Sequence, residues 1–271
     1  MTWGLISKQC KKSFRMGNKV YRYLLRKKED VLVEQKLAGH LSISGHTIKT
    51  LGQRVDKVIT IGGDGTILMA LEHITQPLFS INTGAVGFLT EVEEKDALSG
   101  LQSVLDNNYF LEERVKLKTL LNKKRLPDGA NEVTIQTPLI GKILEFKLYV
   151  QGKLVEKLQG DGLIIATPTG STSYALSVGG PIVDPAIDAL VVAPIAPFRH
   201  YSSPLVIPSD KELRIVLFGK RDAKVAIDGH YTYPFKLHDI LTVAKSENKA
   251  CFIRLEDTFY QRVYEKLCQR R

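Results

Sequence analysis

The spacing of apolar residues changes near residue 114 and divides the 271-residue chain into two parts. Before that point, short apolar runs alternate with helix-like stretches, whereas after it almost every apolar stretch has a period of two. A βαβ-type region followed by a region of strands predicts one α/β domain and one mostly β domain. We expect residues 1–113 with 252–271 to form the first domain and residues 114–251 the second.

The apolar runs of the first part are too dense for half-exposed strands. "VDKVITI" (55–61) places apolar residues on both sides of a strand, as in a parallel sheet covered by helices. "WGLIS", "DVLVEQ" and "PLFSIN" predict further strands, and the segments "SFRMGNKVYRYLLRKKE", "TILMALEHI" and "EEKDALSGLQSVLD" have helical spacing. The first domain is therefore predicted to contain a parallel, Rossmann-like sheet.

The second part reads as strands until its last residues. "RVKLKTLL", "NEVTIQT", "LRIVLF", "AKVAID" and "DILTVAK" alternate, and "EFKLYVQGKLVEKL" alternates around a predicted turn at Gln151-Gly152. Only "TSYALSVGG" has a helical pattern there. "EDTFYQRVYEKLCQRR" (256–271) returns to helical spacing, and we expect this C-terminal helix to pack on the first domain.

Composition excludes several classes of protein. The net charge is +9, but the basic residues are scattered and not interleaved with aromatics, which favours a polyanionic small molecule over nucleic acid. No apolar run approaches the roughly 20 residues that cross a bilayer, and no secretory signal is recognisable. Three widely separated cysteines form neither a metal-ligand spacing nor a disulfide framework, which predicts a cytoplasmic protein without a metal site of its own.

One candidate site follows the densest predicted strand. Gly62, Gly63 and Gly65 surround Asp64 at the carboxyl end of "VDKVITI", where ligands bind in open α/β sheets. Glycines let phosphates approach backbone N–H groups at a helix start. A carboxylate beside phosphates would accept a proton from an attacking hydroxyl or face a phosphate-bound Mg²⁺. The alternative is a plain strand-to-helix turn with an aspartate near the helix start.

A second candidate site is "GDGLIIATPTGSTSYALSVGGP" (160–181). Its strand "LIIA" ends in hydroxyl-bearing residues and glycine, a surface suited to a ribose, an adenine edge or a diphosphate. The alternative is a Ser/Thr-rich loop with a capped helix. Asp161, between two glycines, repeats the pattern of Asp64.

Five motifs in order make the chain resemble the NAD kinases. The motifs are GGDGT at Gly62 to Thr66, the N-x-G-x-x-GFL stretch with Asn82, Gly84, Gly87, Phe88 and Leu89, the pair Asn131-Glu132, the segment Asp161 to Tyr174 with Gly179-Gly180-Pro181, and Asp228-Gly229. Ser173 departs from the family, in which alanine is common at this position.

The resemblance implies transfer of the γ-phosphate of ATP, or of another donor such as polyphosphate, to the 2′-hydroxyl of the adenosine ribose of NAD. It implies Asp64 as the base, and Gly62, Gly63, Gly65 and Thr66 as donor-phosphate ligands. The implied NAD-binding residues are Asn82, Phe88, Asn131, Glu132, Asp161, Thr169, Thr172, Ser173 and Tyr174. A divalent cation such as Mg²⁺ accompanies the donor, and the protein is expected to be a homo-oligomer, a dimer or a tetramer.

Three other readings of the motifs stay open from the sequence. Lipid kinases of the diacylglycerol and sphingosine type share a similar glycine loop, but the segment "TPTGSTSYALSVGGP" is polar and small, unlike a greasy acceptor pocket. Phosphofructokinases lack the combination of Asn-Glu with TPTGST. A non-catalytic dinucleotide sensor would gain nothing from the carboxylate of Asp64.

Overall fold

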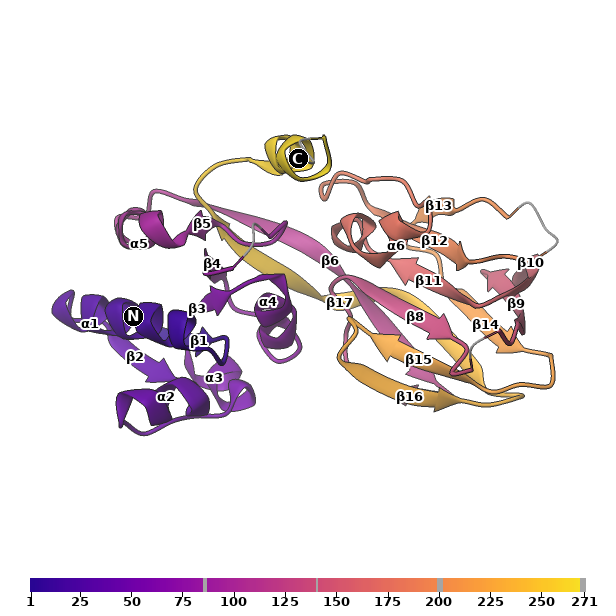
Figure 1. Ribbon diagram of the computed structural model, residues 1–271, viewed down its shortest axis with the longest axis horizontal. Helices are drawn as coiled ribbons and strands as arrows, with labels where there is room; N and C mark the ends of the chain where they lie inside the picture. Colours follow the sequence, from indigo (N-terminus) through magenta and orange to yellow (C-terminus); the bar gives the residue numbers. More distant parts are fainter. Residues whose placement is uncertain (85–86, 140, 199–201, 269–271) are drawn as a thin grey trace. The chain divides into compact units, whose positions relative to one another are not determined.

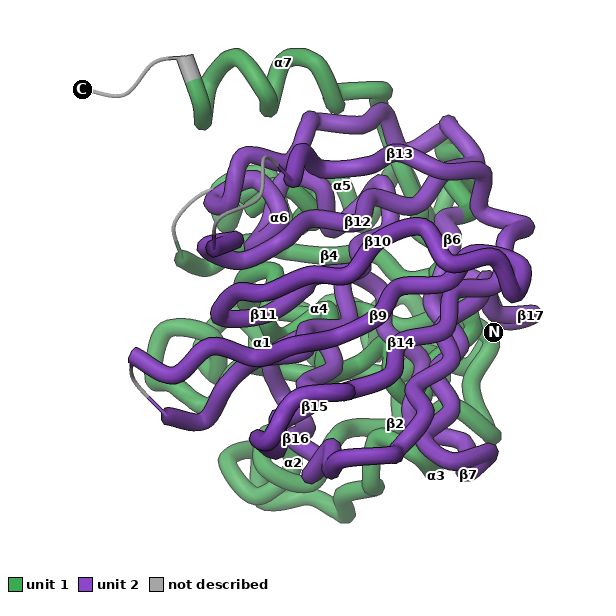
Figure 2. The backbone as a smooth tube through the Cα atoms, turned by 90° about the vertical axis from the view of Figure 1, so that its right-hand side faces the viewer, with its two compact units in different colours: residues 1–113, 250–271 green, residues 114–249 purple. Residues whose placement is uncertain are grey.

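The computed structural model describes residues 1–84, 87–139, 141–198 and 202–268. The chain forms two compact units, residues 1–113 with 250–271 (unit 1) and residues 114–249 (unit 2), which Figure 2 distinguishes by colour. It passes from unit 1 to unit 2 within strand β6 (Phe110–Leu121) and returns within β17 (Ile240–Arg254). Both crossings are therefore continuous strands. None of the helices in the described ranges is both long and apolar enough to span a bilayer.

Unit 1 is built on a parallel sheet in the order β2, β1, β3, β4 (Figure 1). Its strands are β1 (Thr2–Ser7), β2 (Asp30–Val33), β3 (Lys57–Gly62) and β4 (Leu78–Asn82), with β5 (Val92–Glu93) and the end of β17 paired parallel to β4. Every residue of β3 and β4 is buried. The predicted two-sided burial of this sheet is confirmed.

Helices cover the sheet of unit 1 because alternate strand residues face them. The helices are α1 (Lys11–Arg26), α2 (Gln35–Leu41), α3 (Ile48–Arg54), α4 (Asp64–Leu71), the short 3₁₀ turn Glu94–Asp96 and α5 (Ala97–Leu105). Trp3, Ile59 and Phe79 share one apolar cluster with α1, α2 and α5, while α4 lies against β3 and β1. The short helices α2 and α3 were not predicted from the sequence.

Unit 2 consists of antiparallel strands that enclose an apolar core. One set is β6, β7 (Lys124–Arg125), β9 (Leu144–Val150), β10 (Lys153–Gly160), β14 (Leu213–Leu217) and β17. The other is a sheet in the order β13 (Leu205–Pro208), β12 (Ala189–Ile195), β11 (Gly162–Ala166), β8 (Glu132–Gln136), β15 (Ala223–Ile227), β16 (Tyr231–Phe235). The predicted α/β-plus-β fold class is confirmed.

The strand β11 shows how this arrangement follows from sequence. Leu163 and Ile165 lie in the core between the two sets of strands, whereas Ile164 and Ala166 lie in a second cluster with the short helix α6 (Tyr174–Ser177). Both faces of β11 are therefore buried, which requires its unbroken apolar run. The predicted Gln151-Gly152 turn is also present, because both residues have positive φ, 48° and 74°, as a tight two-residue hairpin demands.

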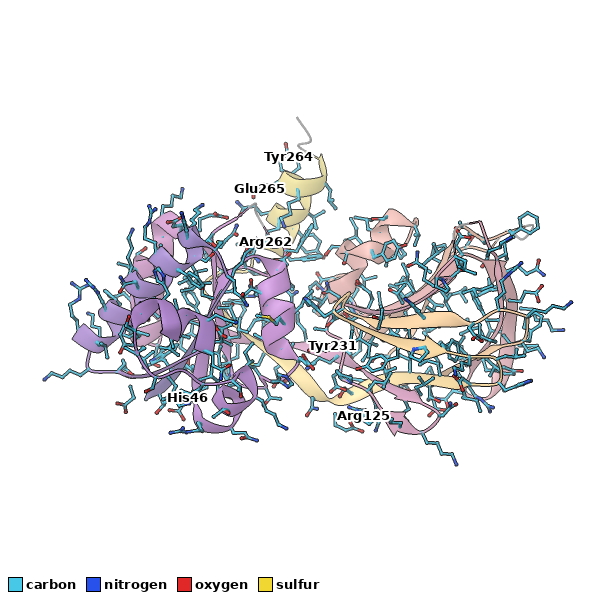
Figure 3. All side chains as sticks on the ribbon, turned by 60° about the horizontal axis from the view of Figure 1, so that its bottom comes forward. His46, Arg125, Tyr231, Arg262, Tyr264 and Glu265 are labelled. Carbon is cyan, nitrogen blue, oxygen red and sulfur yellow. The ribbon has the colours of Figure 1, made fainter. Side chains whose placement is uncertain are left out.

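The C-terminal segment, residues 255–268, belongs to unit 1 and begins directly after β17. It contains α7 (Phe259–Val263) and the π-helical turn Tyr264–Cys268, so the predicted terminal helix is present in a shorter form. Buried Arg254 precedes the segment and contacts Glu91 at 2.8 Å and Glu112 at 2.6 Å. Arg262, labelled in Figure 3, also reaches Glu91, at 3.5 Å.

We expect Arg254→Met to lower the free energy of unfolding by about 3–5 kcal/mol, the cost of removing one partner from a buried ion pair. Arg254 is only 4% exposed, and its loss leaves Glu91 and Glu112 with one cation fewer. Lys211→Met is the matched control, because Lys211 forms a 3.2 Å pair with Asp210 at the surface and should cost about 1 kcal/mol or less. Urea unfolding of both variants measures the difference, and equal losses would contradict the structural role of Arg254.

Candidate active site

The glycine loop after β3 combines one packed glycine with two open ones. A Cβ on Gly62 would lie 2.3 Å from Thr66 Oγ1, whereas a Cβ on Gly63 or Gly65 would meet no atom within 4 Å. Gly62 is therefore required for packing against α4, while Gly63 and Gly65 leave bare backbone at the start of that helix. Bare N–H groups at a helix start favour an anion.

The Asp64 side chain is held by the loop that follows β4. Its Oδ2 accepts the Phe88 N–H at 2.7 Å and its Oδ1 accepts the Leu89 N–H at 3.1 Å. A Cβ on Gly87 would lie only 2.0 Å from Oδ1, so only glycine permits this approach. A carboxylate offers about four acceptor positions. The two hydrogen bonds therefore fix its orientation and leave capacity for a further donor.

Two other predicted residues of unit 1 have structural roles that the sequence did not indicate. Asn82 is fully buried, donates to Glu93 at 3.0 Å and accepts the Gly84 N–H at 3.0 Å, so it shapes the loop after β4. The Phe88 ring is half-buried, and Nζ of Lys266 lies 4.0 Å from its centroid. The predicted contacts of Asn82 and Phe88 with NAD stay predictions.

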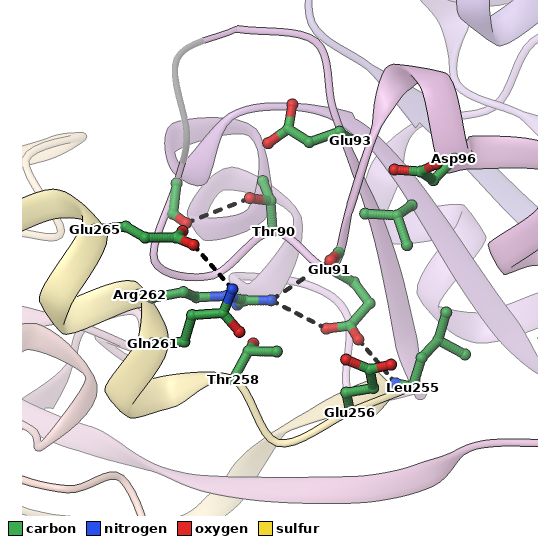
Figure 4. Close-up of a pocket in the computed structure, with 12 residues that line it drawn as sticks. Thr90, Glu91, Glu93, Asp96, Leu255, Glu256, Thr258, Gln261, Arg262 and Glu265 are labelled. Carbon is green, nitrogen blue, oxygen red and sulfur yellow. Dashed lines mark hydrogen bonds and ion pairs between the residues drawn. The ribbon is translucent and has the colours of Figure 1, made fainter.

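A pocket of ≈ 360 Å³ lies between the C-terminal segment and the loop that holds Asp64 (Figure 4). Among its lining residues are Glu91, Glu93, Asp96, Glu256 and Glu265. Arg262 crosses it, donating to the Phe88 carbonyl at 3.0 Å and to the Glu91 carbonyl at 3.4 Å. Because acidic side chains dominate the lining, the pocket is unsuited to a polyphosphate. The bare glycines beside Asp64 are the better anion site.

In unit 2, strand pairing brings together two motifs that are distant in sequence. Strand β8 begins with Glu132, which lies opposite Ala166 at the end of β11. The hydroxyl of Thr167 donates to the Ala130 carbonyl at 2.6 Å, and the hydroxyl of Ser173 lies 3.5 Å from Glu132 Oε1. The Asn-Glu pair and the TPTGST segment therefore form one surface.

Asp228 organises the Asn-Glu pair through the backbone. Its carboxylate accepts the N–H groups of Ala130 (2.7 Å), Asn131 (2.8 Å) and Glu132 (3.0 Å). Asp228 itself has a positive φ of 47°, a strained conformation that Asp tolerates better than most residues. The sequence identified the Asp228-Gly229 motif but not this positioning role.

Two buried oxygen atoms at this site have no hydrogen-bond partner among the described residues, Asn131 Oδ1 and Glu132 Oε2. Each side chain is nearly buried, 8% exposed for Asn131 and 7% for Glu132. Burial, reinforced by the charge of Asp228, raises the pKa of Glu132 to about 7. A buried acceptor without a donor costs about 1–3 kcal/mol. Both atoms therefore have acceptor capacity of the kind that hydroxyl or amine donors satisfy.

The remaining predicted residues of unit 2 divide between the two ends of β11. Thr169, Thr172 and Tyr174 follow its end, on the side of Glu132, and Tyr174 packs partly on the cluster beneath α6. Asp161 directly precedes β11, and this five-residue strand separates it from Thr167 by roughly 15–20 Å. Asp161 therefore lies well apart from the other predicted residues of unit 2, and its predicted contact with NAD stays a prediction.

We expect Glu132→Gln to remove a pH dependence of stability. The pKa of Glu132 is higher in the folded chain, about 7, than its ordinary value of 4.5, so ionisation disfavours folding. In the wild type, the contribution of Glu132 to the free energy of unfolding is fully present below pH 4.5. It falls by about 3 kcal/mol as the pH rises from 4.5 through 7. Urea unfolding at pH 4.5, 6 and 8 measures the difference between the two proteins. A constant difference across this range would contradict the assignment.

Comparison with known proteins agrees with this geometry. Residues 4–109 match the family model described as the ATP-NAD kinase N-terminal domain, and residues 130–255 match the ATP-NAD kinase C-terminal domain. The NAD kinase of Pyrococcus furiosus is 38% identical over 278 residues, covering 100% of both chains, and that of Methanosarcina acetivorans is 39% identical over 245 residues, covering 89% of both.

Solved structures show the same fold. A yeast NADH kinase complexed with NADH superposes with a TM-score of 0.91 at 22% identity, covering 99% of this chain and 87% of that one. An NAD kinase from Archaeoglobus fulgidus in complex with ATP superposes with a TM-score of 0.82 at 26% identity, covering 96% of both chains. With two matched domain models and full-length relatives above 30% identity, the chain belongs to the NAD kinase family.

Proposed function

We propose that this NAD kinase transfers the γ-phosphate of ATP to the 2′-hydroxyl of the adenosine ribose of NAD with Asp64 as the proton acceptor. A secondary hydroxyl is a poor nucleophile at neutral pH, so it needs a positioned base. The hydroxyl oxygen bonds to the γ-phosphorus while its proton passes to the Asp64 carboxylate. The bond from the γ-phosphorus to the bridging oxygen breaks, and ADP leaves with the electron pair. The fixed orientation of Asp64 on the Phe88 and Leu89 amides supports this role.

The donor phosphates are proposed to bind at Gly63 and Gly65. Both glycines leave the backbone uncovered at the start of α4, where N–H groups and the helix dipole favour phosphate oxygens. Thr66 lies in the first turn of the same helix, with its hydroxyl close to Gly62. The substrate is proposed to be the Mg²⁺ complex of ATP, because Mg²⁺ in kinase sites is held largely by phosphate oxygens and water. In the described ranges, no three His, Cys, Asp or Glu residues are grouped to hold a metal ion.

The NAD site is proposed to be the surface around Asn131 and Glu132. The observation that carries this proposal is the pair of buried, unpartnered oxygens, Asn131 Oδ1 and Glu132 Oε2. The vicinal hydroxyls of a ribose are paired donors of the kind these atoms lack. Ser173, 3.5 Å from Glu132 Oε1, and Thr169 add hydroxyl groups beside them. Asp161, at the far end of β11, is then left for the nicotinamide half.

The phosphoryl donor, the acceptor and the oligomeric state are proposed by analogy with relatives. One solved relative is complexed with ATP and another with NADH, which supports ATP as donor and a nicotinamide dinucleotide as acceptor. Polyphosphate as an alternative donor and a dimeric or tetrameric assembly follow from the family resemblance alone. Transfer of ³²P from labelled ATP or polyphosphate to NAD tests the choice of donor, and sedimentation equilibrium tests the oligomeric state.

We expect Asp64→Asn to reduce kcat by about 10²–10⁴-fold, the usual contribution of a general base. The substitution also turns an amide NH₂ toward the Phe88 or Leu89 N–H, so stability should fall by about 1–3 kcal/mol. Label transfer from [γ-³²P]ATP to NAD at saturating substrates measures kcat, and a thermal melt measures the folded fraction. Asp30→Asn, at an exposed position of unit 1, is the control. A wild-type kcat for Asp64→Asn would rule out the base assignment.

We expect Asn131→Ala to raise the KM for NAD about tenfold or more and to leave the KM for ATP nearly unchanged. Because Asn131 Oδ1 has no partner among the described residues, its loss should not lower the free energy of unfolding. Gln136→Ala is the control, since Gln136 lies exposed at the far end of β8, the strand that directly follows Asn131. Steady-state kinetics for both substrates and a thermal melt measure the effect. A destabilised Asn131→Ala with normal KM for NAD would show that the side chain serves folding only.

A further inference from the structure

The glycine loop that follows β3 lacks a side-chain cation. Residues 62–66 read GGDGT and contain an acid but no lysine or arginine. Phosphoryl transfer depends on neutralising charge on the transferred group, and in other nucleotide-binding loops a lysine contributes to this. A cation from another part of unit 1 would therefore be useful next to Asp64.

Lys266 lies at that place. It belongs to the π-helical turn Tyr264–Cys268, and its Nζ lies 4.0 Å from the centroid of the Phe88 ring. The N–H of the same Phe88 donates to Asp64 Oδ2 at 2.7 Å. Lys266 and Asp64 are about 200 positions apart in the sequence. Their shared contact with Phe88 brings the ammonium group near the proposed base.

The segment that carries Lys266 is anchored to the loop of Asp64. Arg262, four positions earlier, donates to the Phe88 carbonyl at 3.0 Å. It also pairs with Glu91 at 3.5 Å (Figure 4). Arg262 therefore binds the backbone of Phe88 while Lys266 covers its ring. This anchoring holds the backbone of Lys266 in place, while its four-carbon side chain lets the ammonium group move by a few ångströms.

Charges around Lys266 come from three elements of unit 1. Burial is the main cause that lowers the pKa of Lys266; Arg262 on α7 also lowers it, Asp64 on α4 and Glu93 on β5 raise it, and the resulting pKa is about 8. With a pKa of about 8, Lys266 is mostly protonated at neutral pH, so its positive charge is available to an incoming anion. Its contact with the aromatic ring is a weak interaction, so a phosphate can replace it.

We propose that Lys266 is the side-chain cation of the donor-phosphate site, where its ammonium contacts the γ-phosphoryl oxygens beside Asp64. The ammonium group leaves the face of the Phe88 ring when the donor binds. It keeps its proton throughout and offsets the negative charge on the transferred γ-phosphoryl group. This inference rests on the proposed function, because it requires the donor phosphates to bind at Gly63 and Gly65. The C-terminal segment is then part of the catalytic machinery and not only a structural tail.

The test compares Lys266→Met, Lys266→Arg and Lys49→Met in the full chain. Methionine keeps the aliphatic stem without the charge, arginine keeps the charge, and Lys49 is an exposed lysine of α3. We expect Lys266→Met to lower kcat/KM for ATP about 10²-fold, the usual effect of removing one stabilising group from a transition state, with the KM for NAD nearly unchanged. Lys266→Arg should retain most activity, and Lys49→Met all of it.

A pH profile supplies a readout that a structural role would not move. Since the ammonium is the active form and its pKa is about 8, wild-type kcat/KM for ATP should fall as pH rises above 8. Lys266→Arg should move this fall to higher pH, because arginine stays charged.

Three outcomes would overturn the proposal: a kcat/KM for ATP of wild-type size in Lys266→Met, an equal loss in Lys266→Arg, or an unchanged alkaline limb in Lys266→Arg. A folding defect in Lys266→Met would show in its melting temperature, and Lys266→Arg then decides alone. The base assignment of Asp64 is tested separately by the kcat of Asp64→Asn, so either idea can fail while the other stands.

Discussion

The carboxylate of Asp64 and two arginine side chains hold the same short stretch of backbone from opposite sides. Asp64 accepts the N–H groups of Phe88 and Leu89, while Arg262 and Arg254 donate to the carbonyls of the same two residues at 3.0 Å each. The backbone N–H and C=O of both residues are thus bound by charged side chains, which make the stronger class of hydrogen bond. The orientation of the proposed base, the loop after β4 and the C-terminal segment therefore depend on one shared set of contacts.

Sequence patterns predicted many, but not all, of the strands whose burial is two-sided or alternating. The apolar run before Gly62 predicted a strand covered by helices, and every residue of β3 is buried. The helices α2 and α3 escaped prediction because each spans only seven residues, too few for a helical period to stand out. Strand β12 was also missed. Its unbroken apolar run, buried at all seven positions, shows no period that separates strand from helix.

For the site, sequence identified residues that lie within short motifs but not those that act across the fold. The motifs located Asp64 and the Asn131-Glu132 pair, and the structure adds why each side chain is held as it is. Lys266 could not be found in this way, because helical spacing shows which face of a segment is apolar and not what that face covers. The sequence identified the Asp228-Gly229 motif but not the role of Asp228, whose three backbone contacts join residues nearly 100 positions apart. Long-range contacts of this kind follow only from the pairing of β8 with β15.

Because unit 2 is inserted within unit 1, the order of synthesis constrains when the protein becomes active. The ribosome releases residues 1–113 first, yet unit 1 lacks the end of β17 and both arginines until residues 250–262 follow. At about 5–20 residues per second, the intervening 114–249 segment takes roughly 7–27 s to translate. During that interval the loop after β4, which orients Asp64, exists without the arginine side chains that hold Phe88 and Leu89. A prematurely terminated chain would thus lack a competent kinase site.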